Sequence, residues 1–309
     1  MTFLLGRLRK LWTRAFFSPE SSLNLAFARV IFSLHAIWVL LSRDLPANAA
    51  LPAEFWSGVD RSELWRYFIV PGHPGLEYGL QWVAVATLSL AALGIMPRLA
   101  CFASAILLYH LALLETIYWT PNPYQRGFTV SVLALFTLSC SRCGDALRLG
   151  GSPPTPPSPI YCWPLRIVQL HFAEAYFISG TSKLTRVGMQ WLDPENLRSW
   201  FLLFAEQDQV QRLSPMFHFV GPWIAEHRLL CIVAGFFGVI ANLCFLSVPF
   251  SRMARRLLVP DAFCFHMMVL LSLNIFWINT PQLLIYVNWQ WLVTRLKGKS
   301  WAGDLHVRT

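Results

Sequence analysis

Nine ionisable side chains fall inside long apolar blocks of this sequence, where charge is costly and therefore points to function. They are Arg29, His35, His110, Glu115, Arg166, His171, Glu174, Lys183 and His266. Inside a bilayer, such groups pair with one another, line a polar cavity or take part in proton transfer. The set is therefore suited to acid–base chemistry or to the binding of a charged group.

Lys183 is the strongest candidate for chemistry. The sequence has only four lysines, and the other three, Lys10, Lys297 and Lys299, lie in basic terminal segments. An amine removed from water gives up its proton more readily and can then act as a general base. A simpler alternative remains open, because Lys183 lies near the end of its block and its stem could carry the ammonium to the membrane interface.

The block that contains Lys183 holds further candidates. At 100° per residue, Tyr176 shares a broad helical face with Lys183, whereas His171 and Glu174 lie on another face. His171 and Glu174 are three residues apart and can hydrogen-bond. They are expected either to assist Lys183 or to form a structural clamp, with each other or with Arg29. Arg29 is alternatively expected to orient an anionic group.

The composition identifies the elements that must position these residues. Hydrophobic residues make up 55% of the 309, charged residues only 13%, and the mean hydropathy is +0.47, which excludes a soluble globule. Blocks near the length of a membrane span predict an all-α, polytopic integral membrane bundle of seven to eight transmembrane helices. The blocks are 23–42, 79–95, 99–117, 127–140, 165–184, 229–250, 262–280 and a short one, 282–294.

The basic residues predict the topology. Arg7, Arg9, Lys10 and Arg14 precede the first block, so the positive-inside rule places the N-terminus in the cytoplasm. The net charge of +9 is then a topology signal, and we expect a lipid bilayer rather than nucleic acid as partner. Compact loops favour a multi-pass protein of a bacterial inner membrane. Three segments are expected: a cytoplasmic basic N-terminus with an interfacial segment (1–22), one transmembrane domain (23–294) and a basic tail (295–309).

Metal and redox chemistry have weak support in the sequence. Cys140-Ser141-Arg142-Cys143 has the spacing of a dithiol or half a zinc site, but no second C-x-x-C accompanies it, which favours coincidence. His110, Glu115 and His266 could hold a metal only if their helices converge, and hydrogen bonds between helices are the commoner use of such residues. We therefore predict no metal.

One stretch resembles a known family. Residues 175–184, Ala-Tyr-Phe-Ile-Ser-Gly-Thr-Ser-Lys-Leu, followed by Trp191-Leu192-Asp193, resemble the signature segment of the horizontally transferred transmembrane (HTTM) family. That family includes the membrane part of vitamin K-dependent gamma-glutamyl carboxylases. Arg29, Asn122 and Phe265-His266 resemble family features as well.

The resemblance implies a function. It implies that Lys183 is a base at the outer face, and that a reduced, vitamin K-like quinone is the cofactor. The chain departs from the carboxylases in carrying Ser182 where they have a second lysine, Pro194 where a glycine is usual, and no histidine in 151–161. It also lacks their large lumenal domain, so the expected substrate is a peptide or lipid-like molecule rather than a large protein.

The resulting expectation is a membrane-embedded, carboxylase-like enzyme (a lyase) that performs quinol-coupled carboxylation or a related proton abstraction. The expected catalytic residues are Lys183, Tyr176, His171 and Glu174; the expected substrate-binding residues are Arg29, Asn122, His110, Glu115 and His266. An alternative stays open: a non-catalytic membrane module that binds a secreted peptide or a partner protein, as family members implicated in toxin maturation suggest. Replacing Lys183 by Arg separates the two, because only an enzyme needs a neutral amine.

Overall fold

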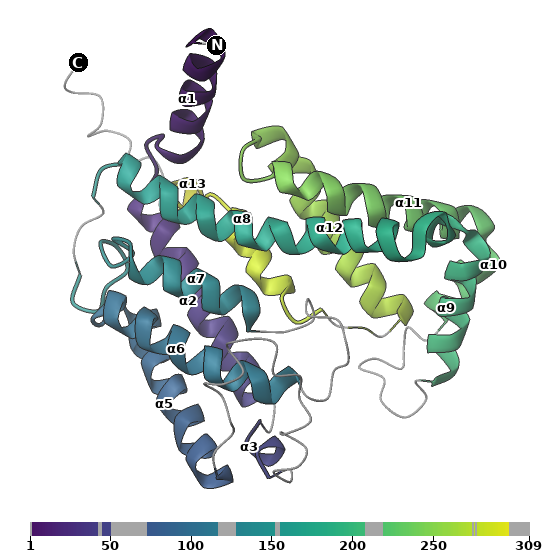
Figure 1. Cartoon of the computed structure of the whole chain (residues 1–309), viewed down its shortest axis with the longest axis horizontal. Helices are drawn as coiled ribbons and strands as arrows, with labels where there is room; N and C mark the ends of the chain where they lie inside the picture. Colours follow the sequence, from purple (N-terminus) through teal and green to yellow (C-terminus); the bar gives the residue numbers. More distant parts are fainter. Residues whose placement is uncertain are drawn as a thin grey trace. The chain divides into compact units, whose positions relative to one another are not determined.

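The computed structural model describes residues 2–42, 45–50, 73–116, 128–151, 155–207, 219–273, 275 and 277–296 (Figure 1). Over these residues the chain is helical, with one isolated antiparallel bridge between Glu20 and Ser158. In this part of the chain, four helical segments are long and apolar enough to cross a membrane. They are α2 (Ser22–Leu41), α5 (Pro74–Leu93), Arg228–Ser247, which contains α11 (Arg228–Cys244), and α12 (Arg252–Leu273). The predicted all-helical, membrane-embedded class agrees with this architecture.

The chain divides into two compact units. The first comprises Met1–Val168 and Val287–Thr309, and the second comprises Gln169–Tyr286. Helix α8 (Pro159–Ser182) contributes its first residues to the first unit and its remaining residues to the second.

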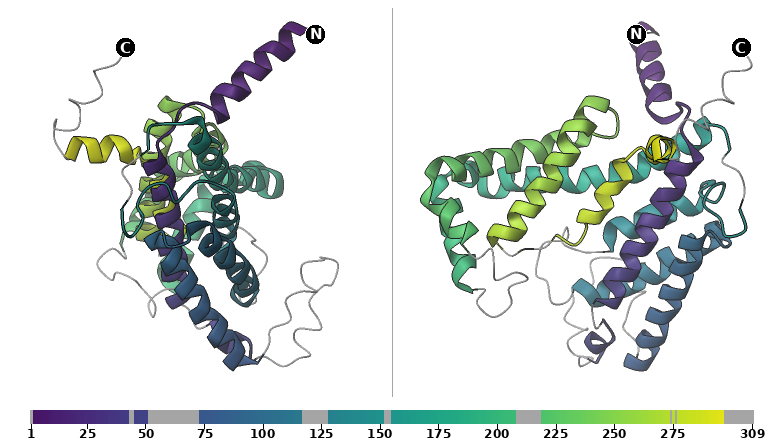
Figure 2. Two further views of the ribbon diagram at one scale, coloured as in Figure 1. Left: turned by 90° about the vertical axis from the view of Figure 1, so that its left-hand side faces the viewer. Right: turned by 180° about the vertical axis from the view of Figure 1, so that it is seen from behind.

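The first unit is built on a ring of four helices (Figure 2). Helix α2 packs on α5, α5 on α6 (Pro97–Thr116), α6 on α7 (Thr129–Ser139), and α7 back on α2. The buried residues of α5 recur every three or four positions, as one face of a helix requires: Glu77, Gln81, Ala84, Leu88 and Ala91. Large apolar side chains such as Trp82 and Leu90 are exposed on the opposite side, which suits contact with lipid.

Local signals set the ends of these helices. The side chain of His73 accepts a hydrogen bond from the backbone N–H of Gly75, and Pro74 follows at the start of α5, where proline is favoured. The helix ends at Gly94, whose φ of 74° is left-handed. Helix α2 begins after Ser21, whose hydroxyl accepts from the backbone N–H of Leu23.

Three further helices of the described part belong to the first unit. They are α1 (Thr2–Phe16), α3 (Leu45–Asn48) and α13 (Trp289–Leu296). Helix α13 packs on α2, where Trp289 stacks on Phe27 with ring centroids 4.2 Å apart and Asn24 accepts a hydrogen bond from the backbone N–H of Gln290. These contacts attach the last described segment to the first unit.

The second unit contains the rest of α8 and the helices that follow it. A π-helical turn (η3, Lys183–Val187) and a 3₁₀ turn (η4, Gly188–Leu192) lead from α8 to α9 (Pro194–Gln207). Then come α10 (Val220–Glu226), α11, the 3₁₀ turn η6 (Phe245–Ser247), α12 and the 3₁₀ segment η7 (Thr280–Tyr286).

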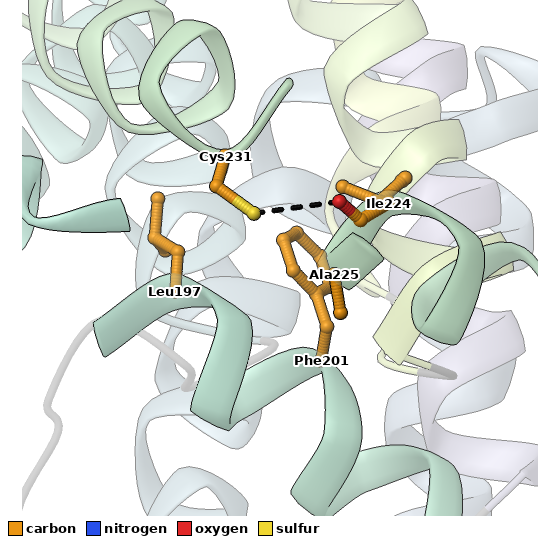
Figure 3. Close-up of a cluster of buried hydrophobic side chains, with 5 residues drawn as sticks. All are labelled: Leu197, Phe201, Ile224, Ala225 and Cys231. Atoms are coloured by element: carbon orange, nitrogen blue, oxygen red, sulfur yellow. Dashed lines mark hydrogen bonds between the residues drawn. The ribbon is translucent and has the colours of Figure 1, made fainter. Parts of the chain in front are cut away.

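Helices α9, α10 and α11 share a buried apolar cluster formed by Leu197, Phe201, Ile224, Ala225 and Cys231 (Figure 3). The Cys231 thiol also donates to the carbonyl of Ile224 over 3.5 Å, so the cluster leaves this thiol satisfied. Gly235 lets α11 approach α9 and η4 closely, because a Cβ there would lie 2.9 Å from Leu197 Cδ1 and 3.0 Å from the carbonyl oxygen of Trp191.

Most predicted blocks coincide with helices, with differences at the ends. Helix α8 begins at Pro159 rather than at 165, and α12 begins at Arg252 rather than at 262. The eighth block, 282–294, is not one helix: it is divided between η7 and α13 by Val287 and Asn288. Pro164 and Pro260 lie inside α8 and α12, so neither proline ends its helix.

Candidate functional site

The second unit brings together two of the predicted residues, Tyr176 from α8 and His266 from α12. The Tyr176 hydroxyl and His266 Nε2 lie 2.9 Å apart, within hydrogen-bond distance. Both residues are buried, at 4% and 9% exposure. The two residues are 90 positions apart in the chain, and the sequence alone does not indicate that they meet.

Aromatic rings enclose this pair. Phe245 stacks on Tyr176 with centroids 4.1 Å apart, and Trp277 stacks on His266 at 4.2 Å. Trp277 also meets Tyr176 edge to face at 5.0 Å. Such packing fixes the orientation of both rings and keeps water from the hydrogen bond between them.

Lys183 lies at the end of the helix that carries Tyr176. Its Nζ donates to the Ser179 hydroxyl over 3.1 Å and sits 5.3 Å from the centroid of the Trp191 ring. It is also within electrostatic range of His266. No carboxylate forms an ion pair with Lys183 within the described ranges.

The backbone around Lys183 is irregular. Lys183 is the first residue of the π-helical turn η3, which replaces the regular helix as α8 ends. Single π turns are rare and frequently occur at functional sites. The turn ends at Gly188, whose φ of 65° few other residues adopt without strain.

His171 and Glu174 lie on a different face of α8, as their spacing predicts. Their side chains are 30% and 55% exposed, with His171 Nδ1 3.7 Å from the Glu174 carboxylate. The buried residues of the same stretch are Gln169, Phe172, Ala173 and Tyr176. The structure therefore places His171 and Glu174 together, but on another face from Tyr176.

Asn279 is a buried polar residue that no motif or spacing in the sequence indicates. It is 1% exposed and follows Trp277 by two positions. Its side-chain oxygen has no hydrogen-bond partner among the described residues. A buried, unpaired amide oxygen is costly, and such atoms often mark the place of a ligand or a water.

Arg29 lies in the first unit and is fully buried. Its Nη1 donates to the carbonyl of Cys143 and its Nη2 to the carbonyl of Leu147, each over 2.6 Å. These two bonds hold the chain that follows α7. The sequence predicted a carboxylate or an anionic ligand as partner, and the contacts found are two backbone carbonyls.

His110 of α6 pairs with a residue that the sequence analysis missed. Its Nε2 lies 2.9 Å and 3.1 Å from the two carboxylate oxygens of Glu77, which is fully buried on α5. The sequence does not indicate Glu77, because the predicted apolar block begins at 79, whereas α5 begins at Pro74. The predicted preference for hydrogen bonds between helices holds for His110.

The remaining predicted residues are placed as follows. His35 of α2 lies 3.4 Å from the Ser131 hydroxyl of α7. Glu115 belongs to α6, but its side chain lies outside the described part, and Asn122 falls among residues that are not described.

The cysteine motif is divided between surface and interior, because Cys140 is exposed and Cys143 is buried. Cys143 has a different thiol neighbour, Cys101 of α6. A hydrogen bond from the Cys101 thiol, together with the charge of Arg29, lowers the pKa of Cys143 to about 7. Over the described residues, no three His, Cys, Asp or Glu side chains gather closely enough to hold a metal ion.

Comparison with known proteins adds no relative. No family model matches this chain, and no curated protein and no solved structure matches it.

Proposed function

We propose that this chain is a membrane-embedded enzyme in which Lys183 acts as a general base. The observation that carries the proposal is the environment of its amine, whose neighbours are the neutral Ser179 hydroxyl at 3.1 Å and the indole ring of Trp191 at 5.3 Å. A lysine beside a carboxylate would be held in its charged form, and Lys183 has no such partner in the described part of the chain.

The proposed step is a proton abstraction. The lone pair of the neutral Nζ takes a proton from an acidic C–H or O–H of the substrate, which leaves a substrate anion and a Lys183 ammonium. The Ser179 hydroxyl and the Trp191 ring stabilise that ammonium by a hydrogen bond and a cation–π contact. Capture of a carbanion by carbon dioxide would add a carboxyl group, and the proton then leaves Lys183 for solvent.

Tyr176 and His266 are proposed as the second acid–base element. A tyrosine hydroxyl hydrogen-bonded to an imidazole can donate a proton to a developing anion and recover one from the ring. His171 and Glu174 lie on the other, exposed face of α8. We propose that they act on that face, without direct contact with the Tyr176–His266 pair.

A reduced quinone is the proposed cofactor. The Trp277 and His266 rings already stack on each other with centroids 4.2 Å apart, which leaves no room for a head group between them. The Asn279 side-chain oxygen, which has no partner among the described residues, is an acceptor that suits a quinol hydroxyl. When bound, a quinol would be oxidised by dioxygen, and that oxidation would drive the proton abstraction, which itself consumes no reducing equivalents.

The membrane topology and family assignment belong to the same proposal. We place the chain in a bacterial inner membrane as a multi-pass protein of seven to eight spans with a cytoplasmic N-terminus. Four helices of sufficient length and the basic residues of α1 support this placement. The segment from Ala175 to Leu184 supports membership in the HTTM family, with a peptide or lipid-like substrate at the outer face.

The test compares cells that produce wild type, Lys183→Arg or Lys183→Ala at equal membrane levels. Mass spectrometry of secreted peptides, lipids and quinones is expected to show a product with wild type alone, heavier by one carboxyl group if the reaction is a carboxylation. Lys183→Arg should lack the product, because a guanidinium stays protonated.

Lys299→Arg is the matched control, since it makes the same exchange in the C-terminal tail and should keep the product. Identical profiles for wild type and folded Lys183→Arg would contradict the lysine base and favour a module that binds a secreted peptide or a partner protein.

A further inference from the structure

Helix α1 carries an unusual distribution of charge. Its fifteen residues, Thr2–Phe16, include four basic side chains and no acidic one. Arg7, Lys10 and Arg14 recur at the spacing of one helical face, and all three are exposed. The helix therefore presents a concentrated positive surface.

Two large apolar side chains of α1 are exposed as well. Leu11 is 64% exposed and Trp12 is 61% exposed. Trp12 and Phe16, one turn apart, contact each other with ring centroids 4.4 Å apart. Figure 2 shows α1 projecting away from the ring of α2, α5, α6 and α7. A soluble environment would leave these apolar groups in water at a cost.

Covalent geometry limits where α1 can lie. Only five residues separate Phe16 from Ser22, the first residue of the spanning helix α2. Fully extended, five residues reach at most about 18 Å. The linker is also held, because Glu20 pairs with Ser158, and the end of α1 is held because the Cys162 thiol donates to the carbonyl of Ala15. The proposed topology has α2 enter the membrane at this point, and on that topology α1 cannot be far from the membrane surface.

We propose that α1 lies along the membrane surface and binds the head groups of anionic phospholipids through Arg7, Arg9, Lys10 and Arg14, with Leu11 and Trp12 inserted into the acyl boundary. Charge complementarity selects this occupant over neutral lipid, since each basic residue near an anionic surface strengthens binding roughly fivefold. Trp12 suits the interface because its ring is apolar with one polar N–H.

The test uses the full chain in nanodiscs of phosphatidylcholine alone or of phosphatidylcholine mixed with phosphatidylglycerol, and measures hydrogen exchange by mass spectrometry. Amides of α1 should exchange at least about tenfold more slowly in the anionic discs, and added salt should reduce the difference. Peptides from α12 serve as the internal control and should exchange equally in both discs.

Two variants separate the contributions. Replacing Arg7, Arg9, Lys10 and Arg14 together by Gln should abolish the effect of anionic lipid, whereas Leu11→Gln with Trp12→Gln should weaken protection in both discs. These side chains are exposed, so both variants should unfold at the wild-type temperature.

Equal exchange of wild-type α1 in the two discs would overturn the proposal, as would an unchanged difference in the Gln variant. Native membranes provide a third sample, and protection of α1 there but in neither disc would also overturn the proposal and would point to a protein partner. None of these outcomes depends on whether Lys183 is a base.

Discussion

The hydroxyl of Tyr176 and Nε2 of His266 lie 2.9 Å apart, and this hydrogen bond joins α8 to α12 within the second unit. Neither ring is open to water, since Tyr176 is 4% exposed and His266 is 9% exposed. Each group therefore satisfies the other, and the loss of one leaves the other buried and unpaired.

A double-mutant cycle measures this relationship. Tyr176→Phe and His266→Leu should each lower the free energy of unfolding by about 1–3 kcal/mol, because each leaves a buried polar group without its partner. The double variant should cost less than the sum of the two, since it removes both polar groups. Thermal unfolding in detergent provides the measurement. Strictly additive losses would show that the two side chains do not interact.

Arg29 is expected to stabilise the first unit through the planar geometry of its guanidinium group as well as through its charge. Arg29→Lys keeps the charge but cannot bond the carbonyls of Cys143 and Leu147 with one rigid fork. Loss of one bond to a charged donor should cost about 1.5–3 kcal/mol. The measurement is the unfolding temperature of the two proteins.

Arg98→Lys is the matched control for that change. Arg98 makes one bond, from Nε to the carbonyl of Ser141, and it is exposed. Its replacement should cost less than about 1 kcal/mol. If both variants unfold at the same temperature, the two hydrogen bonds of the buried Arg29 guanidinium stabilise the fold no more than the Arg98 bond does. A ligand-binding role for Arg29 would then gain support.

The positions of helices could be predicted from the sequence, because they depend on hydrophobic periodicity and length. Contacts between segments that are far apart in the chain could be predicted less well. Apolar blocks located α2, α5, α6, α7, α8 and α11 because long, continuous apolar runs favour helices. They did not pair Tyr176 with His266, or His110 with Glu77, because such contacts depend on how helices pack. Arg29 shows the same limit: a buried arginine was expected to seek a carboxylate, but free carbonyls after a helix end serve equally well.

Gly94 should tolerate no side chain. Its φ is 74°, and a Cβ there would lie 2.7 Å from the carbonyl oxygen of Leu147 and 2.9 Å from the Cα of Arg148. Both neighbours are backbone atoms, so a side chain cannot simply rotate away. Gly94→Ala should lower the free energy of unfolding by more than about 1 kcal/mol, measured by thermal unfolding.

Gly79 of the same helix provides the comparison. A Cβ there meets no atom within 4 Å. Gly79→Ala should leave stability unchanged or raise it by about 0.5–1 kcal/mol, because alanine loses less backbone entropy on forming a helix. Equal effects of the two substitutions would contradict the close packing of Gly94 against the chain after α7.

The thiol of Cys143 should make stability depend on pH. A hydrogen bond from Cys101 and the charge of Arg29 lower its pKa from 9.0 to about 7 in the folded chain. An acid whose pKa falls on folding contributes stability that is complete above its unfolded pKa and is lost as the pH drops through the folded pKa. Between pH of about 7 and about 9, the unfolding temperature of the wild type should therefore rise relative to that of Cys143→Ser.

Two further variants identify the cause of that rise. Cys101→Ala removes the hydrogen-bond donor and should reduce the rise, since the lowered pKa of Cys143 depends first on that bond. Cys140→Ser changes an exposed thiol of the same C-x-x-C motif and should leave the rise intact. If Cys140→Ser removed the rise and Cys101→Ala did not, the pKa of Cys143 would depend on the C-x-x-C motif. It would then not depend on the contact of Cys143 with Cys101 of α6. That result would restore the dithiol interpretation of Cys140 and Cys143, which the burial of Cys143 beside Cys101 argues against.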